Sequence, residues 1–272
     1  MTIVAVLGFV LAALIGLSLG LLGGGGSILT VPVLVYVLGF AAKPAIAMSL
    51  PVVGVTSLVG AGLHWRRGNV RVGTALTFGA FAMIGAYGGA RLAAFVSGAA
   101  QLAILSIVML VAAVSMLRVR REDPVPGGAE PPRFALIAPV ALVVGALTGL
   151  VGIGGGFLIV PALAILGRVP MRESVGTSLL VIALNAGAGF AGYVGTVPID
   201  WGFLAAFASI AVLGALAGTA LVGVIPAAAL RRAFGVFLIL VGGFVLYMNR
   251  GVLTGTTATS AGARLPAWAA AR

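Results

Sequence analysis

Two glycine clusters carry the clearest chemical signal in the sequence. They comprise Gly23, Gly24, Gly25 and Gly26 in one case, and Gly152, Gly154, Gly155 and Gly156 in the other. Each glycine weakens a helix by about 1 kcal/mol relative to alanine, so each cluster should interrupt an apolar helix. Inside a bilayer, the exposed backbone survives only where protein buries it or where it lines a watery cavity. The helix that follows each break offers free N–H groups and a positive dipole end, which together predict an anion site.

A second interpretation of the glycines is that they only let helices pack closely. A phosphate-loop interpretation fails because no Gly-Lys-Ser/Thr follows either cluster. Ser27 comes directly after the first cluster and joins the predicted anion site. Pro32 and Pro161 are expected in the first turns of the two following helical segments, where proline is tolerated.

Polar side chains occupy matched places in two later segments. Ser49 and Thr56 are seven residues apart, as are Ser178 and Asn185, and Thr177 adjoins Ser178. Seven residues make two helical turns, so each pair shares a face and could donate hydrogen bonds to an oxyanion. The alternative for serine and threonine is a hydrogen bond to their own helix backbone.

Charged groups are rare inside the apolar segments. Arg91 is the one cation within an otherwise uncharged stretch, and it is a candidate charge partner for the substrate. It lies near the end of that stretch, so snorkelling to the interface is the alternative. No Asp or Glu falls deep inside a predicted helix, and paired acids or a histidine cluster would be expected of an enzyme. The sequence therefore predicts no enzyme, no metal and no cofactor.

The composition places these groups in a membrane. Of 272 residues, 61% are apolar and 8% are charged, with a mean hydropathy of +1.25. Soluble domains are about one quarter charged, so this chain cannot cover a water-facing surface. The net charge of +11 comes largely from short links between apolar segments, where it indicates topology signals and lipid contacts, not nucleic-acid binding.

The uncharged stretches predict an all-α polytopic membrane protein of about eight transmembrane helices. The predicted helices are 2–22, 45–65, 72–95, 99–117, 134–151, 173–194, 200–223 and 228–248. The apolar run from Ser27 to Phe40 is too short to span comfortably, so a half-helix or re-entrant segment is expected there.

An internal duplication appears when the sequence is shifted by 129 residues, because glycines, prolines and cations then coincide without a gap. Gly25, Pro32 and Ser49 fall on Gly154, Pro161 and Ser178. The expected organisation is a first four-helix repeat, a polar linker, a second repeat and a flexible tail, at 1–121, 122–133, 134–250 and 251–272. Repeats with interrupted segments in matching places are typical of secondary transporters.

The direction of the two repeats depends on how often each crosses the membrane. Four crossings imply parallel copies, whereas half-helices that cross fully imply inverted ones. Eight helices would divide the cations ten against six, which favours the parallel case and cytoplasmic termini. The ten are Arg66, Arg67, Arg71, Arg118, Arg120, Arg121, Arg133, Arg250, Arg264 and Arg272. The six are Lys43, Arg91, Arg168, Arg172, Arg231 and Arg232.

The doubled pattern resembles the sulfite exporter family named for TauE and SafE. The pattern is a glycine-rich break, an apolar run with proline, a basic turn and then Ala-Thr-Ser-Leu. It stands here as LLGGGGSILTVPVLVYVLG with MSL, and as LVGIGGGFLIVPALAILG with GTSL. HWRRGNV is similar to the family's link after the second helix. Met48 replaces the threonine that stands at Thr177, so an asymmetric site would follow if Thr177 binds substrate.

The resemblance implies a bacterial inner-membrane permease that exports sulfite or a sulfonate such as sulfoacetate. Alternating access around the paired glycine breaks is the expected mechanism. A passive anion channel and a membrane-embedded subunit of a larger complex remain alternatives. The expected partners are a small anion and the lipid bilayer. A coupling ion, either a proton or sodium, and a second copy of the chain are further candidates.

Overall fold

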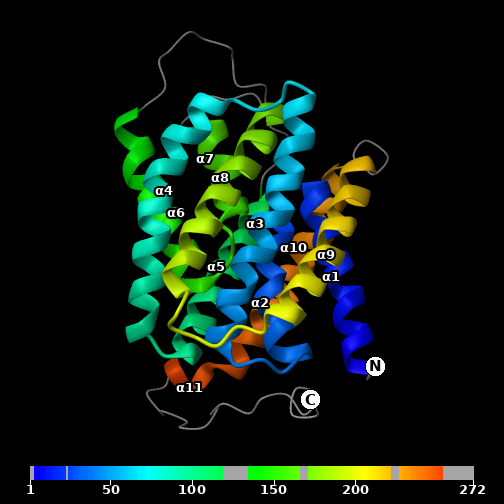
Figure 1. The fold of residues 1–272 in the computed structure, drawn as a ribbon, viewed down its shortest axis with the longest axis vertical. Helices are drawn as coiled ribbons and strands as arrows, with labels where there is room; N and C mark the ends of the chain where they lie inside the picture. The colour runs from blue at the N-terminus through cyan, green and yellow to red at the C-terminus, as the bar shows by residue number, and fades with distance from the viewer. Residues whose placement is uncertain (1–2, 23, 119–133, 166–170, 222–226, 254–272) are drawn as a thin grey trace.

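The computed structural model of the protein describes residues 3–22, 24–118, 134–165, 171–221 and 227–253, all in helices or short connections (Figure 1). The first half contains α1 (Ile3–Leu22), η1 (Gly25–Leu29), α2 (Thr30–Pro32), η2 (Val33–Val37), α3 (Ala42–Arg66), α4 (Val72–Leu92), η3 (Ala93–Phe95) and α5 (Gly98–Arg118). The second contains α6 (Phe134–Val151), α7 (Gly156–Ile165), α8 (Met171–Tyr193), α9 (Trp201–Ala220), α10 (Ala227–Met248) and α11 (Arg250–Leu253). These bounds lie within a few residues of the predicted helices.

Five of the described helices are long and apolar enough to cross a membrane. They are 42–66, 72–95, 98–115, 173–193 and 201–220. Shorter apolar helices cover 6–21, 26–37, 137–151 and 232–248. Long stretches without charge explain this, because a helix pairs its own backbone groups and only its side chains need suit the lipid.

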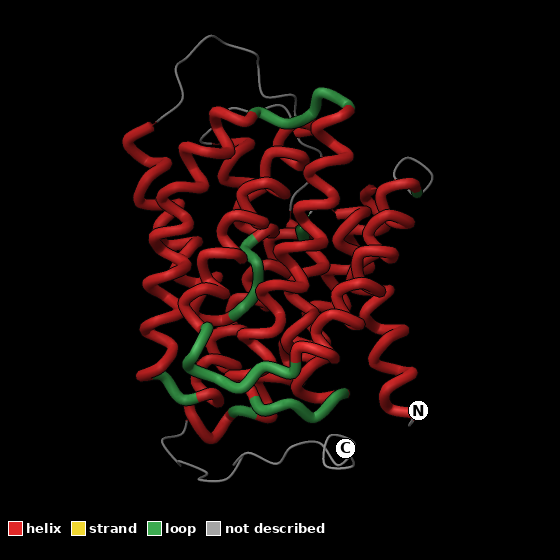
Figure 2. Tube along the Cα trace, in the orientation of Figure 1, coloured by secondary structure: helices red, strands yellow, loops and turns green. Residues whose placement is uncertain are grey.

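Both glycine clusters interrupt helices. Gly152, Gly154 and Gly155 have φ values of 75°, 66° and 72°, and Gly24 has φ of 128°. Residues with a side chain rarely adopt these φ values, so glycine lets the backbone leave the helical conformation here. Figure 2 shows the second break as a short loop within the helical bundle.

The first half-helix is irregular, passing from a 3₁₀ turn through one α turn to a π segment that ends at Val37. Pro32 therefore lies beyond the first turn, as does Pro161 within α7. The first-turn prediction was wrong because each helical segment begins at the glycine cluster itself, well before its proline. The π segment follows Pro32 directly.

The first half-helix runs back along α1. A Cβ added at Gly26 would lie 2.6 Å from Leu19 N, at the end of α1. One added at Gly8 would lie 2.5 Å from Leu38 Cδ2, just after the half-helix. The half-helix thus returns the chain to the end of the bundle where α1 began, which is the lower end in Figure 1.

Small residues set the closest helix contacts. In the α1–α9 pair, a Cβ at Gly16 would overlap the carbonyl of Ala211, and one at Gly20 would overlap that of Ala215. The α4–α6 pair makes the equivalent contacts through glycines of both helices. Such close approach gains van der Waals packing, which drives helix association in lipid.

Helices in matching places of the two halves run antiparallel. Along α3 and α8, a Cβ added at Gly60 would lie 3.2 Å from Leu179 Cδ1, whereas one added at Gly189 would lie 3.4 Å from Leu50 Cδ1. The α5–α10 pair likewise joins the end of one helix to the start of the other. The two halves therefore run in opposite directions, and the parallel arrangement was wrong. The physical reason is the returning half-helix, which makes the net number of crossings per half odd.

Contacts between helix ends show which basic residues lie at the same end of the bundle. Arg71 pairs with Glu173, so the start of α4 and the start of α8 lie at one end. A Cβ at Gly235 would lie 3.0 Å from Leu117 Cγ, which puts the start of α10 beside the end of α5. At the other end of the bundle, Lys43 Nζ donates to Ala94 O at 3.1 Å. The ten-against-six division of the cations was therefore wrong.

Among the described residues, seven basic positions lie at the upper end of the bundle and three at the lower end (Figure 1). The upper positions are Arg66, Arg67, Arg71, Arg118, Arg172, Arg231 and Arg232. The lower positions are Lys43, Arg91 and Arg250.

Candidate anion site at the paired helix breaks

The two glycine breaks touch each other inside the bundle. A Cβ added at Gly156 would lie 2.6 Å from Gly24 Cα, and one added at Gly24 would lie 2.9 Å from Gly156 Cα. Ile182 of α8 closes the same contact, with Cδ1 2.9 Å from the Gly24 Cβ position. Both glycines are buried. The breaks of the two halves thus form one shared structure.

Two serines form hydrogen bonds to carbonyl oxygens of the second break. Ser27 Oγ donates to Ile153 O at 2.6 Å, which joins the first break to the second. Ser49 Oγ of α3 lies 2.8 Å from Gly152 O and 2.7 Å from Ile46 O of its own helix, so these two carbonyls share its one hydrogen. Both side chains are fully buried. Their hydroxyl hydrogens are used within the protein, so these serines position the break and keep its carbonyls satisfied.

The N–H groups of the second break have a different environment. Gly152 N donates to Thr148 O at 2.8 Å, continuing α6 by one bond. Among the described residues, the structure records no partner for the N–H groups of Gly154 and Gly155. They lie at the start of α7, where the helix dipole is positive. Unpaired donors at a helix start are suited to a negative ligand.

Neighbouring side chains hold the glycines of this break tightly. A Cβ at Gly154 would lie 2.5 Å from Val53 Cγ1, and one at Gly155 would lie 2.5 Å from Thr148 Oγ1. A Cβ at Gly152 would lie 2.6 Å from Ser49 Oγ. Because these positions also need positive φ, no other residue would fit without moving the backbone.

Asn185 of α8 is a fully buried polar side chain near the breaks. It is 0% exposed, and neither its Oδ1 nor its Nδ2 has a hydrogen-bond partner in the part of the chain that the structure describes. It lies on the α8 face that includes Ile182, which touches Gly24, and Gly189. A buried amide without partners costs about 1–3 kcal/mol, so its retention calls for a ligand or a water.

Two predicted ligands bond to their own helices. Thr56 Oγ1 donates to Val52 O at 2.7 Å, within α3. Ser178 Oγ donates to Val175 O at 2.8 Å, within α8. These are the local backbone bonds that compete with ligand contact for such residues.

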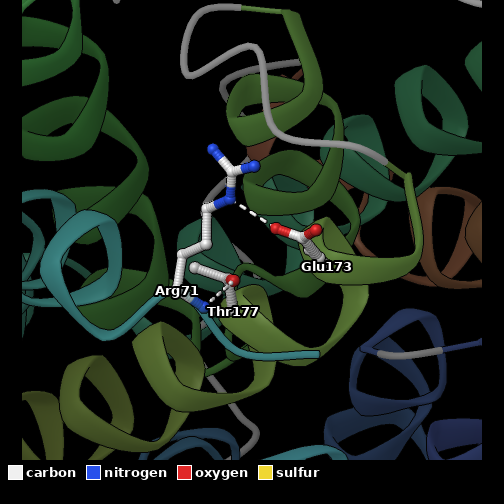
Figure 3. A network of polar contacts seen from close by, with 3 residues as sticks. All are labelled: Arg71, Glu173 and Thr177. Atoms are coloured by element: carbon white, nitrogen blue, oxygen red, sulfur yellow. Dashed lines mark hydrogen bonds and ion pairs between the residues drawn. The ribbon is translucent and has the colours of Figure 1, made fainter. Parts of the chain in front are cut away.

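Thr177 belongs to a polar cluster at the upper end of α8 (Figure 3). Its Oγ1 accepts from Arg71 N at 3.0 Å, and the Arg71 side chain pairs with Glu173. A Cβ at Gly176 would also overlap the Asn69 carbonyl. This cluster binds the α3–α4 connection to α8, and it is half exposed at the ion pair, so its electrostatic energy is small.

The remaining predicted site residues lie away from the contact between the breaks or outside the described residues. Arg91 is exposed near the end of α4, with its guanidinium carbon 5.9 Å from the centre of the Tyr87 ring. It does not join the breaks. Gly25 begins the 3₁₀ turn, and Gly26 packs on α1. Gly23 lies outside the described residues.

The predicted site did not include Gln101 of α5 or Tyr193 of α8. Both are buried, and both reach Leu150 O, just before the second break. The signal available was a lone glutamine within an apolar helix. It went unused because its place in the other half is Leu230, so the comparison of repeats did not select it.

Paired broken helices, in an apolar chain whose described residues lie in helices and short connections, are typical of membrane transporter proteins. The sulfite exporter TauE/SafE family model matches residues 8–245. The chain belongs to this family, as the doubled glycine pattern indicated.

Curated relatives have names of the same kind. A "Probable membrane transporter protein" of Xylella fastidiosa is 34% identical over 245 residues, covering 87% of this chain and 92% of the relative. "Probable membrane transporter protein YdhB" of Bacillus subtilis is 28% identical over 226 residues, covering 81% and 91%. The Methanocaldococcus jannaschii relative MJ0441, named alike, is 26% identical over 194 residues, covering 68% and 72%. No solved structure matches the chain.

Proposed function

We propose that this membrane transporter exports a small sulfur oxyanion, sulfite or an organosulfonate such as sulfoacetate, from a site at the contact of the two breaks. The observation that carries the proposal is the pair of N–H groups at Gly154 and Gly155 that have no partner among the described residues, together with the buried amide of Asn185 one turn from Ile182, which touches Gly24. An oxyanion accepts several hydrogen bonds at once, and charge-assisted bonds are the strong ones.

Asn185 supports an anionic ligand because its Nδ2 offers donors that the protein leaves unused. Its counterpart in the first half is Thr56, which bonds to its own helix. The two halves would therefore contribute unequally, with α7, α8 and the second break providing most donors.

The close contact of the breaks supports a transporter over a passive channel. Gly24 and Gly156 leave no room for even one methyl group between them. Passage of an anion past this point requires the two halves to move relative to each other. Inverted halves that rock around a shared centre supply such a motion, which is alternating access.

We extend the proposal to topology. Each half would comprise a returning broken helix pair and three full crossings, so that about eight long helices lie in an inner membrane, six of them as full crossings and two within the broken pairs. The excess of basic residues at the upper end, seven against three among the described residues, supports a cytoplasmic location for that end. Ile3 and α11 at the lower end would then face outward, opposite to the orientation inferred from eight parallel crossings.

A ligand screen tests the anion site. Purified protein should gain thermal stability with sulfite, sulfoacetate or thiosulfate more than with sulfate. Asn185→Ala should weaken that binding by about ten- to a hundredfold, the value of one hydrogen bond to a charged ligand. Ser106→Ala is the matched control, because Ser106 is equally buried but bonds within α5. Equal affinities in the two variants, or no stabilisation by any of the anions, would contradict the site.

Reporter fusions test the topology. A reporter at Arg121, in the link after α5, should be cytoplasmic, and one placed after Arg250 should be external. Paired alkaline phosphatase and green fluorescent protein fusions distinguish the two sides, since each is active on one side only. Reporters on the same side would contradict the inverted halves. Reporters on opposite sides but exchanged would contradict the orientation alone.

A further inference from the structure

Three oxygen-bearing groups meet at the carboxyl end of α6, directly before the second break. Gln101 Nε2 lies 2.9 Å from Leu150 O and 3.3 Å from Tyr193 Oη. Tyr193 Oη lies 3.3 Å from Leu150 O. The three atoms form a compact triangle between α5, α6 and α8. Gln101 is 0% exposed and Tyr193 is 2% exposed.

One atom of this cluster is unsatisfied. Gln101 Oε1 is buried and has no hydrogen-bond partner among the residues that the structure describes. Oε1 belongs to the same terminal amide as Nε2, which reaches the end of α6, so rotation about the last side-chain bond can bring Oε1 to that place. A half-turn of the terminal amide exchanges Nε2 and Oε1 without moving any other group. The triangle then consists of three oxygens.

We infer that this triangle is a binding site for a small monovalent cation, with Na⁺ as the best fit. Ions of about this size hold oxygens at about 2.3–2.6 Å, which separates neighbouring oxygens in the shell by roughly 3.3–3.7 Å. The observed 3.3 Å separations need little adjustment, and the 2.9 Å pair opens as the amide turns.

Helix dipoles supply the compensating charge. α6 ends at Val151 and α8 ends at Tyr193, so two carboxyl ends with negative partial charge face the triangle. Carbonyls next to an unwound stretch and helix carboxyl ends are the groups that hold coupling cations in other secondary transporters. The amino end of α5 opposes them, because Gln101 lies in its first turn. We therefore expect a weak site, with a dissociation constant in the millimolar range.

The cation site adjoins the proposed anion site and deepens the proposed function, on which its coupling role rests. Leu150 is two residues from Gly152, so a cation at its carbonyl would stabilise the turn that presents Gly154 and Gly155. The first half has no equivalent, since His64 and Leu230 occupy the places of Tyr193 and Gln101. A single cation would bind per chain.

Equilibrium dialysis of the purified full chain against ²²Na⁺, in choline chloride, tests this inference. The wild type should bind sodium saturably. Gln101→Leu should lose that binding, and Gln101→Glu should bind more tightly because a carboxylate of the same shape replaces the amide. Ser106→Ala, which alters a buried side chain of the same helix, should bind as the wild type does.

Tyr193→Phe removes a second oxygen, so it should weaken sodium binding by about tenfold while size-exclusion chromatography shows a folded protein. No saturable sodium binding by the wild type, or undiminished binding by folded Gln101→Leu, would overturn the site. Anion stabilisation measured in choline alone separates the proposals. Anion binding without sodium binding rejects only the cation site, and sodium binding without anion binding rejects only the proposed function.

Discussion

Gly149→Leu should prevent the protein from accumulating in a folded state. A Cβ at this position would overlap Ala86 O and lie 2.7 Å from Ala86 C and 2.8 Å from Ala90 N. All of these are backbone atoms of α4, so no side-chain rotation can relieve the clash. The α4 and α6 backbones would have to separate along their whole contact. We expect a loss above about 4 kcal/mol, in the range that only disruption of the core produces.

Gly88→Leu is the matched control for this substitution. Gly88 lies within α4, and nothing approaches its Cβ position within 4 Å. Replacing a helical glycine gains up to about 1 kcal/mol of helix propensity, and this gain applies equally at Gly149. The difference between the variants thus isolates the backbone contact. Yield and melting temperature in detergent measure it, and similar values for both variants would show that α4 and α6 do not pack as described.

The helices and their breaks could be predicted because each depends on local composition. Uncharged stretches fix where a chain lies in lipid, and consecutive glycines cannot sustain a helix. The ungapped shift of 129 residues matched Gly25 with Gly154, and both lie at the breaks. No long-range information was needed for either conclusion.

The relative direction of the two halves could not be predicted, because it depends on whether one short segment crosses the membrane or returns. Residues 25–37 are apolar whether they cross the membrane or return beside α1. The contacts of Gly8 and Gly26 decide this, and they involve residues that composition alone cannot pair. The predicted division of the cations between the two sides was wrong for the same reason, since each cation after this segment was assigned to a side by counting crossings.

The candidate site could likewise be predicted only in part. Spacing correctly placed Ser49 and Asn185 on the helices that flank the breaks, but it cannot tell which oxygen a hydroxyl will meet. Ser49 reaches Gly152 O as well as its own turn, Thr56 bonds only within its own helix, and Asn185 has no hydrogen-bond partner among the described residues. Gln101 is the instructive omission, because a site present in one half only is invisible to a comparison of repeats.

Gly156→Ala should slow sulfite efflux from proteoliposomes by about ten- to a hundredfold while the protein remains folded. The added methyl would lie 2.6 Å from Gly24 Cα and 2.7 Å from Gly24 O, across the contact between the two breaks. Overpacking by one carbon costs about 1–3 kcal/mol, and each 1.4 kcal/mol on a barrier changes a rate about tenfold. The penalty falls on the state in which the breaks touch, and alternating access has to pass through this state between its two open states, so the barrier to transport rises.

Gly187→Ala controls for the methyl itself, since Gly187 lies in α8 with nothing within 4 Å of its Cβ position. Both rates are normalised to folded protein by size-exclusion chromatography. Gly24→Ala, which enters the same contact from the other side at 2.9 Å, should repeat the defect. Wild-type efflux by Gly156→Ala would mean that the contact opens freely during transport. The breaks would then be only a packing device, and the anion pathway would have to lie elsewhere among the helices.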